Sequence, residues 1–225
     1  MTVLFEDKHL IVCIKPQGVL SQSDDKGRES MVSLLGDVFP VHRLDKETEG
    51  IMVFAKTAEA AAAMSSLVQS HEDFRKEYLA VLEGKPDKSS GRLSDFLFHD
   101  VKRNKTYVVD RERRGVKRAE LSYETLGEAT DGEKTLSLVR VRLYTGRTHQ
   151  IRVQFASRGL PLAGDRKYGG SKSADGLALF ASRLSFCHPM TKEDLSFEAF
   201  PRRDGAFSLF PYNGTALCQN CYYIQ

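Results

Sequence analysis

A polar segment in the first quarter of the chain, HRLDKETEG at residues 42–50, carries residue types from which a catalytic site could be built. Its Asp45 stands between Arg43 and Lys46, and nearby positive charge favours an ionised carboxylate. An ionised, partly desolvated carboxylate can act as a nucleophile on a sugar or an electron-poor ring. Taken by itself, the pattern still favours an ordinary turn or capping aspartate, because loop aspartates most often bond to the backbone.

Apolar and alternating patterns around this segment predict the elements that hold it. The run IMVFA, residues 51–55, predicts a buried strand directly after the polar segment. Residues 3–14 predict a pair of strands that ends at the turn signal KPQG, residues 15–18. Helices are expected at 30–39, 57–71 (with Thr57 as N-cap) and 148–158, and further strands at 78–82, 106–110, 118–125, 139–143, 178–186 and 195–199.

These elements predict an α+β protein with a mixed, mainly antiparallel β-sheet and a few flanking helices around an active-site cleft. We expect a catalytic domain at residues 1–212, with room for two lobes, and a C-terminal tail of unknown role at 213–225. No stretch reaches the apolar length of a membrane span, and the N-terminus is unlike a signal peptide. We therefore expect a cytoplasmic protein.

The positive charge of the chain is concentrated in one segment. The net charge is only +3, yet residues 102–118 hold eight Lys or Arg against two acids. Such a concentration suits a phosphate-rich partner, with Arg113, Arg114 and Lys117 as the predicted phosphate contacts. The alternative is a solvated basic hairpin that binds nothing.

Four segments, in order, resemble the RluA-type RNA pseudouridine synthases. HRLDKETEGIMVFAKT resembles the signature of that family, in which His-Arg-Leu-Asp precedes an apolar strand. IVCIKPQGVL resembles its Lys-Pro-x-Gly strand and turn, and RKEYLAVLEG resembles its Lys-x-Tyr strand. LYTGRTHQIRVQFASRGLPLAGDRKYGG resembles its Gly-Arg-Thr-His-Gln-Ile-Arg helix and its Gly-Asp-x-x-Tyr-Gly turn. Together the four cover most of residues 3–200, which makes the resemblance specific.

The resemblance implies a role for each matching residue. Asp45 falls on the family's essential aspartate, and Arg147 on the arginine that pairs with it and helps keep it charged. Tyr78 falls on the tyrosine that packs against the target uracil and has been considered for proton abstraction at C5. Ile151 falls where an aliphatic side chain contacts the base, and Arg43 on an arginine thought to fill the space that the flipped nucleotide leaves.

The implied activity is isomerisation of selected uridines in structured ribosomal or transfer RNA to pseudouridine. The reaction breaks N1–C1′ and forms C5–C1′ without a redox step or an outside atom, so no cofactor or metal is expected. Asp45 could add to C6, attack C1′ or accept the C2′ proton, and the sequence leaves these three routes open. We expect a compact family member without an S4 domain, acting as a monomer with no obligatory protein partner.

Two positions depart from the family pattern, and neither removes a catalytic group. Glu49 replaces the usual small Ser before the glycine, and we expect it to face solvent. Gln154 replaces a common His after Ile-Arg-Val. Both departures bear on substrate preference.

Three other functions compete with this interpretation. A catalytically silent RNA-binding protein could keep the same fold, although Asp45, Tyr78 and Arg147 are all present. A glycoside hydrolase could pair Asp45 with Glu47 or Glu49, but these acids are crowded into one loop, whereas paired carboxylates normally come from separate strands. The C-x-x-C of Cys218 and Cys221 could bind zinc or act in redox chemistry, but the chain offers no second pair.

Overall fold

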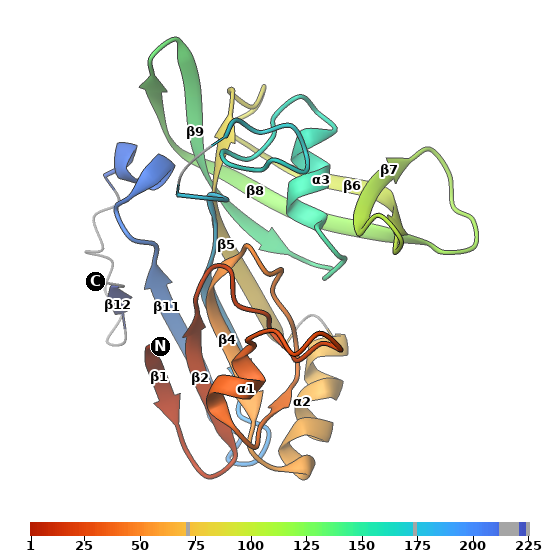
Figure 1. Cartoon of the computed structure of the whole chain (residues 1–225), viewed down its shortest axis with the longest axis vertical. Coiled ribbons are helices and arrows are strands. Elements are labelled where there is room, and N and C mark those ends of the chain that lie inside the picture. Colours follow the sequence, from red (N-terminus) through yellow and green to blue (C-terminus); the bar gives the residue numbers. More distant parts are fainter. Residues whose placement is uncertain (71–72, 173–174, 212–220, 224–225) are drawn as a thin grey trace. The chain divides into compact units, whose positions relative to one another are not determined.

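The computed structural model describes residues 1–70, 73–172, 175–211 and 221–223. The chain divides into two compact units, each with its own β-structure (Figure 1). Unit 1 comprises Met1–Lys76, Phe180–Arg202 and Asn213–Gln225, and unit 2 comprises Glu77–Leu179 and Arg203–Tyr212. Among the described residues, no helix has both the length and the apolar character needed to cross a bilayer.

Unit 1 is built on a mixed sheet. Strand β2 (Leu10–Lys15) pairs antiparallel with β1 (Val3–Glu6) and β4 (Glu49–Ala55). Strand β4 also pairs antiparallel with the short β3 (Phe39–Pro40) and parallel with β10 (Leu179–Cys187). Strand β10 pairs antiparallel with β11 (Asp194–Phe200), which is parallel to β12 (Cys221–Tyr223). The apolar runs of β2 and β4 are buried, as expected of strands covered on both faces.

The described part of unit 1 also holds two helices, and local capping determines where each begins or ends. Helix α2 (Ala58–Ser70) starts after Thr57, whose Oγ1 accepts the Ala60 N–H at 3.2 Å. Helix α1 (Met31–Leu35) is shorter than the predicted 30–39, because Gly36 leaves the helix at φ +83°. The predicted Thr57 cap is therefore confirmed, and the predicted length of the first helix is wrong.

Unit 2 contains an antiparallel sheet in which β6 (Ser90–Asp100) lies between β7 (Lys105–Val109) and β8 (Val116–Asp131). Strand β8 continues into a long hairpin with β9 (Lys134–Leu143) (Figure 1). The unit also holds helix α3 (Gln150–Ala156), the 3₁₀ helix η1 (Gly205–Leu209) and Glu77–Glu83 of strand β5 (Phe74–Glu83). Leu97, Ala119 and Val153 form a small core between α3 and this sheet, with Val108 and Tyr168 packed against it.

The predicted α+β architecture with a mixed, mainly antiparallel sheet is confirmed, but one strand was not predicted and the start of one helix was wrong. Strand β6 was not expected, because its polar and apolar residues do not alternate cleanly. Both β7 and β8 pair with this strand. Helix α3 begins at Gln150 and not at 148, because His149 has a left-handed backbone at φ 54°, ψ 24°.

Gly50, the glycine that follows the polar segment, lies where two strands of unit 1 approach closely. It pairs with Ala181 of β10 and has φ +128°. A Cβ at this position would lie 2.4 Å from the carbonyl oxygen of Ala181 and 2.5 Å from its nitrogen. Both neighbours are backbone atoms, which cannot swing aside as a flexible side chain can, so only glycine fits. The parallel pairing of β4 with β10, which anchors the end of the polar segment, therefore depends on Gly50.

Candidate active site

Asp45 lies in a tight backbone turn at the entrance to β4, in unit 1. The Thr48 N–H donates to the Asp45 carbonyl at 3.0 Å, and the turn formed by Leu44–Thr48 is called the aspartate turn below. Leu44 and Thr48 are buried, whereas Asp45 is half-buried. The two ends of the turn are therefore embedded in the unit while the carboxyl-bearing residue keeps part of its surface open.

A buried lysine holds the aspartate turn on its C-terminal side. The Lys15 ammonium is fully buried and donates to the carbonyl oxygens of Pro16 at 2.9 Å, Val19 at 2.7 Å and Lys46 at 3.0 Å. The Lys46 carbonyl also accepts the Gly18 N–H at 2.9 Å. All three ammonium protons are thus used, as burial of a charged group requires. The Lys-Pro-x-Gly turn is therefore the support on which the aspartate turn rests.

Ser21 holds the aspartate turn on its N-terminal side. Its hydroxyl donates to the Leu44 carbonyl at 2.7 Å and accepts the Leu44 N–H at 3.0 Å. One buried side chain therefore binds both backbone groups of the residue before Asp45. With Lys15 on the other side, Asp45 is flanked by fixed backbone in both directions.

Burial lowers the pKa of the Lys15 ammonium to about 8, against the opposing effect of the carboxylates of Glu47, Glu49 and Asp45. The three acids lie along the aspartate turn and the first residue of β4, so their charge favours the protonated lysine. At neutral pH the ammonium keeps its three donors, and above pH ~8 it loses one of them. The support of the turn is therefore sensitive to pH in the mildly alkaline range.

His42 is neutral at physiological pH and its imidazole accepts a hydrogen bond from the backbone. Burial of its imidazole, with repulsion from Lys76, lowers the pKa of His42 to about 3. Its Nε2 accepts the Val53 N–H at 3.1 Å, which leaves the proton on Nδ1, and the ring packs edge-on against Phe74. His42 therefore helps to fix the segment before Asp45 and is not a proton donor for the reaction.

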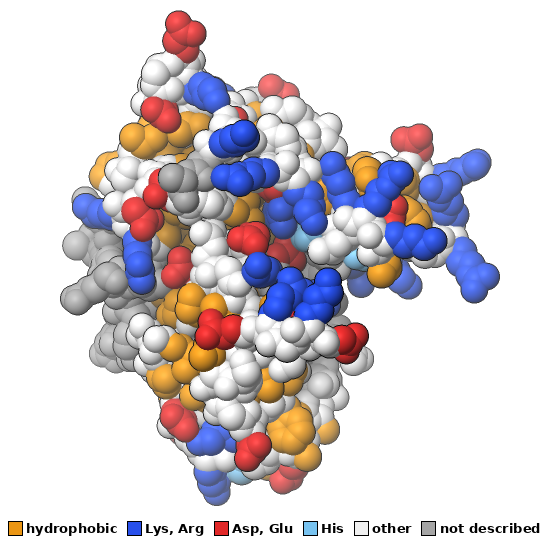
Figure 2. All heavy atoms as spheres, viewed as in Figure 1, with side chains coloured by type: hydrophobic (Ala, Val, Ile, Leu, Met, Phe, Trp, Pro, Cys, Tyr) orange, Lys and Arg blue, Asp and Glu red, His pale blue; other side chains and the backbone are white. Residues whose placement is uncertain are grey.

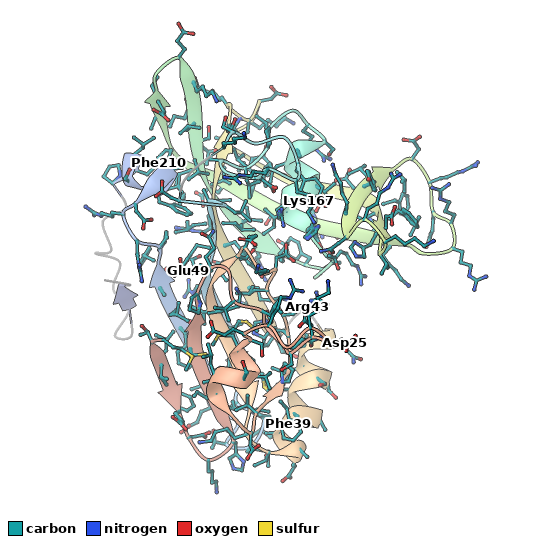
Figure 3. All side chains as sticks on the ribbon, in the orientation of Figure 1. Asp25, Phe39, Arg43, Glu49, Lys167 and Phe210 are labelled. Carbon is teal, nitrogen blue, oxygen red and sulfur yellow. The ribbon has the colours of Figure 1, made fainter. Side chains whose placement is uncertain are left out.

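Two charged residues flank the aspartate turn. Arg43 is exposed, and its side chain extends from the loop before β4 (Figure 3). Glu49 is half-buried at the start of β4, so the expectation that it faces solvent holds only in part. Its charge acts on Lys15, which relates this departure from the family pattern to the support of the turn.

Unit 2 holds Arg147 in a second ordered loop, Thr145–His149, called the arginine loop below. The Arg147 Nε donates to the Arg118 carbonyl of β8 at 3.1 Å, and its backbone N–H donates to Gln150 Oε1 at 3.0 Å. Gln150 Nε2 in turn donates to the Glu120 carbonyl at 3.0 Å. The Arg147 side chain is exposed, but the bond from its Nε to β8 restrains it.

The residues predicted to contact the target uracil, Tyr78 and Ile151, also lie in unit 2. Ile151 is buried on the first turn of α3, four residues after Arg147, and Phe155 is buried one turn further on, as predicted. Tyr78 is buried in β5. Gln154, the second departure from the family pattern, is fully buried and donates to Asp95 Oδ2 at 2.7 Å, so its role is to link α3 to β6.

Arg113, Arg114 and Lys117 are exposed on the basic segment, residues 102–118. The guanidinium of Arg113 lies over the ring of Phe98 at 5.8 Å from its centroid, a cation–π contact that places it beside β6. Figure 2 shows Lys and Arg side chains gathered over this end of unit 2. Lys117 is adjacent to Arg118, whose carbonyl accepts the bond from Arg147. The basic segment therefore runs into β8, the strand to which the arginine loop is bonded.

The described residues contain no group of three or more His, Cys, Asp or Glu side chains arranged to hold a metal ion. Cys218, one half of the C-x-x-C considered for zinc, lies outside the described residues.

Comparison with known proteins identifies the family. A family model described as RNA pseudouridylate synthase matches residues 9–157, a stretch that includes the aspartate turn and the arginine loop. The chain belongs to the RNA pseudouridylate synthase family. The RluA-type resemblance is thereby confirmed, and the protein is an isomerase that acts on RNA.

Curated relatives of this synthase include bacterial members of the family. It is 34% identical over 215 residues to the uncharacterized RNA pseudouridine synthase YhcT of Bacillus subtilis, covering 89% of this chain and 69% of that one. It is 33% identical to ribosomal large subunit pseudouridine synthase D of Zymomonas mobilis, covering 88% and 68%. It is 30% identical to the dual-specificity RNA pseudouridine synthase RluA of Escherichia coli, covering 88% and 92%.

Solved structures confirm the fold of the synthase. Human RNA pseudouridylate synthase domain containing 4 matches with a TM-score of 0.71 at 23% identity, covering 90% of this chain and 89% of that one. Human RNA pseudouridylate synthase domain containing 1 matches with a TM-score of 0.72 at 21% identity, covering 90% and 83%.

Several supporting residues of the synthase were not predicted as parts of the site. Lys15 was recognised only as a turn signal, and Ser21 and Gln150 were not singled out. Lys15 directly follows the apolar run of β2, but a lysine at the end of a strand is usually exposed, so its burial could not be predicted from that position. Nothing in the sequence distinguishes Ser21 from its neighbours Ser23 and Ser30.

The lowered pKa of Lys15 predicts a specific dependence of stability on pH. The unfolded lysine titrates near ~10.5 and the folded one near 8, so between these values the unfolded state binds more protons. The free energy of unfolding should therefore rise with pH across this window, by on the order of 1 kcal/mol per pH unit relative to a chain without the buried amine.

Denaturant melts from pH 7 to 10 on wild type and Lys15→Met measure this difference. Lys26→Met, which alters an exposed lysine of the same unit, should follow the wild-type curve. Parallel curves for wild type and Lys15→Met would show that Lys15 does not titrate in this window.

Proposed function

We propose that this synthase converts specific uridines in structured RNA to pseudouridine with Asp45 as its catalytic carboxylate. The observation that carries the proposal is the support of Asp45 from both sides, by Lys15 at the Lys46 carbonyl and by Ser21 at both backbone groups of Leu44. Because two buried polar side chains bind the backbone on either side of Asp45, this residue is preorganised. A preorganised, half-exposed carboxylate suits attack on a bound nucleotide.

The chemistry asked of Asp45 is an isomerisation. The N1–C1′ bond breaks, the uracil turns while bound, C5 joins C1′, and the C5 proton is lost while N1 gains one. Asp45 can assist by adding to C6, by attacking C1′ or by accepting the C2′ proton. Each route needs an ionised carboxylate whose position does not drift during the turn of the base.

We propose that residues of unit 2 take part in the same reaction. The Arg147 guanidinium supplies positive charge that favours the ionised state of the reacting carboxylate. Tyr78 packs against the uracil and Ile151 supplies an aliphatic contact to it. Arg43, exposed beside the aspartate turn, fills the space that the flipped nucleotide leaves in the RNA helix. Flipping costs a few kcal/mol, and such contacts offset part of that cost.

The basic segment is proposed to bind the phosphates around the target. Arg113, Arg114 and Lys117 are all exposed there, and the segment is continuous with the strand that holds Arg147. Because relatives are named for large ribosomal subunit and dual-specificity modification, we propose a ribosomal or transfer RNA stem-loop as the target. Recognition of a loop by its shape and backbone would select the uridine.

We further propose that residues 1–212 act together as one catalytic domain, followed by a C-terminal tail of unknown role at 213–225, of which β12 pairs with β11. The synthase would work in the cytoplasm as a monomer, without a cofactor or an obligatory protein partner.

Substitution of Asp45 tests the proposed function. The purified chain is incubated with cellular RNA that carries tritium at uridine C5, taken from cells that lack this protein. Formation of the C5–C1′ bond expels the label, so wild type should release tritium and Asp45→Asn should be slower by at least ~100-fold. Glu47→Gln, a matched change on the same turn, should retain most of the rate.

The outcomes separate the competing functions. Release of free base or sugar, or loss of activity in Glu47→Gln, would favour a hydrolase with two carboxylates. Absence of release by wild type, with RNA binding intact and a known synthase active on the same RNA, would favour a silent RNA-binding protein.

Replacement of Arg113, Arg114 and Lys117 together by alanine tests the phosphate contacts. The dependence of log K on log salt concentration should become shallower by about 2 to 3, because each phosphate contact releases counterions. The same charge loss at Lys85, Lys88 and Arg140, exposed elsewhere on unit 2, should leave the salt dependence unchanged. An unaltered slope in the first variant would contradict the assignment.

A further inference from the structure

Tyr168, in the Gly-Asp-x-x-Tyr-Gly turn of unit 2, lies at the junction of three elements. Its ring packs against the small core of Leu97, Ala119 and Val153, which joins β6, β8 and α3. The turn itself is fixed by a buried ion pair in which Arg152 of α3 donates to both oxygens of Asp165, at 2.7 and 2.8 Å. The position of the tyrosine ring is therefore determined by apolar packing and by this ion pair.

The Tyr168 hydroxyl joins two segments that are distant in the sequence. It accepts the N–H of Thr106, a buried residue of β7, at 2.8 Å. It also lies 2.9 Å from Nδ1 of His149 in the arginine loop. The hydroxyl accepts from Thr106 and can donate its own proton to His149 Nδ1 when the imidazole proton is on Nε2.

The residue that this hydroxyl binds has an unfavourable backbone conformation. His149 is buried and has φ 54°, ψ 24°, the left-handed region that side chains with a Cβ avoid. This conformation lies in the turn that the Gln150 N–H closes by donating to the Arg147 carbonyl at 3.1 Å, and α3 starts directly after it. Such a conformation persists only where neighbouring contacts enforce it.

Thr106 makes a second link to the same loop. Its Oγ1 donates to the Thr148 carbonyl at 2.9 Å, so His99 Nδ1, 3.0 Å from that oxygen, must be the donor to it. Next to Tyr168, Lys167 (labelled beside α3 in Figure 3) donates through Nζ to the Asn104 carbonyl at 2.8 Å. The start of β7, which lies within the basic segment, is thereby tied to the two residues that follow Arg147.

We propose that Tyr168 is a positioning residue for Arg147: its hydroxyl, held by Thr106, keeps His149 in the left-handed conformation that directs the arginine loop. The inference rests on the proposed function, because Arg147 matters only if it acts in the isomerisation. The basic segment and the arginine loop then form one hydrogen-bonded assembly. RNA bound to the basic segment is thus held in a fixed relation to Arg147.

The Tyr168→Phe variant removes the hydroxyl and keeps the ring in its core. At saturating RNA the single-turnover rate of tritium release should fall about tenfold, as expected for one lost positioning hydrogen bond, with RNA affinity within about twofold of wild type. Tyr123→Phe is the matched control, since that hydroxyl bonds the Lys88 carbonyl and touches no part of this assembly. It should leave both rate and affinity unchanged.

A double-mutant comparison separates positioning from general stability. If Tyr168 acts through Arg147, its hydroxyl has little left to position once Arg147→Lys has removed the planar guanidinium. Tyr168→Phe should then slow the Arg147→Lys enzyme by less than about twofold. A tenfold effect in both backgrounds, or an unchanged rate in the wild-type background, would overturn the proposal.

His149 provides an independent test if Tyr168→Phe does not fold. Glycine adopts the left-handed region readily and alanine does not. His149→Gly should therefore be several-fold faster than His149→Ala at equal RNA affinity, and equal rates would overturn the proposal. Absence of tritium release by wild type would instead overturn the proposed function, and the role of Tyr168 with it.

Discussion

The bond between the buried Lys15 ammonium and the Lys46 carbonyl is the interaction on which the proposed active site depends. A charged group out of water needs all its donors satisfied, and Lys15 satisfies them with three backbone carbonyls. One of these belongs to the residue after Asp45, so a requirement of the lysine becomes a constraint on the aspartate turn. The Lys-Pro-x-Gly segment and the His-Arg-Leu-Asp segment are thus one structure, although 30 residues separate Gln17 from Glu47, which also bond to each other.

In unit 2 the backbone of the arginine loop is held in place by a different set of contacts. The arginine loop carries no buried cation of its own, and its geometry comes from contacts to side chains of other elements. Gln150 ties it to β8, and Tyr168 with Thr106 ties it to β7. Both loops carry an exposed or half-exposed charged residue on backbone that hydrogen bonds hold in place, so the charge stays accessible while the backbone is restrained.

Much of this arrangement could be predicted from the sequence where the pattern is periodic. The IMVFA strand, the cap at Thr57 and the inward faces of Ile151 and Phe155 follow from apolar spacing and side-chain chemistry. Strand β6 could not be predicted in this way, because RLSDFLFHD is polar and apolar without a regular period. The basic segment was recognised as a concentration of charge, but the pairing of its strands with β6 could not be predicted, because β6 itself was not.

The candidate site shows the same division between local and non-local information. Asp45 and Arg147 could be proposed because their motifs are contiguous. Ser21 could not, because its importance comes from the Leu44 backbone, 23 residues away. The left-handed His149 could not either, since no local signal requires it and the Tyr168 hydroxyl that contacts it comes from a distant turn. Such supporting residues can be identified only from the structure, because their partners are backbone groups that are distant in the sequence.

The most direct test of this account is the single-turnover rate of Ser21→Ala on labelled RNA at saturating concentration. The substitution leaves the carboxylate intact and removes only the support of Leu44, and Ser23→Ala, whose hydroxyl bonds Ser30, is its control. We predict a rate about tenfold below wild type, with unchanged RNA affinity and a normal rate for Ser23→Ala. A wild-type rate in Ser21→Ala would contradict it, because the aspartate turn would then need no support to act.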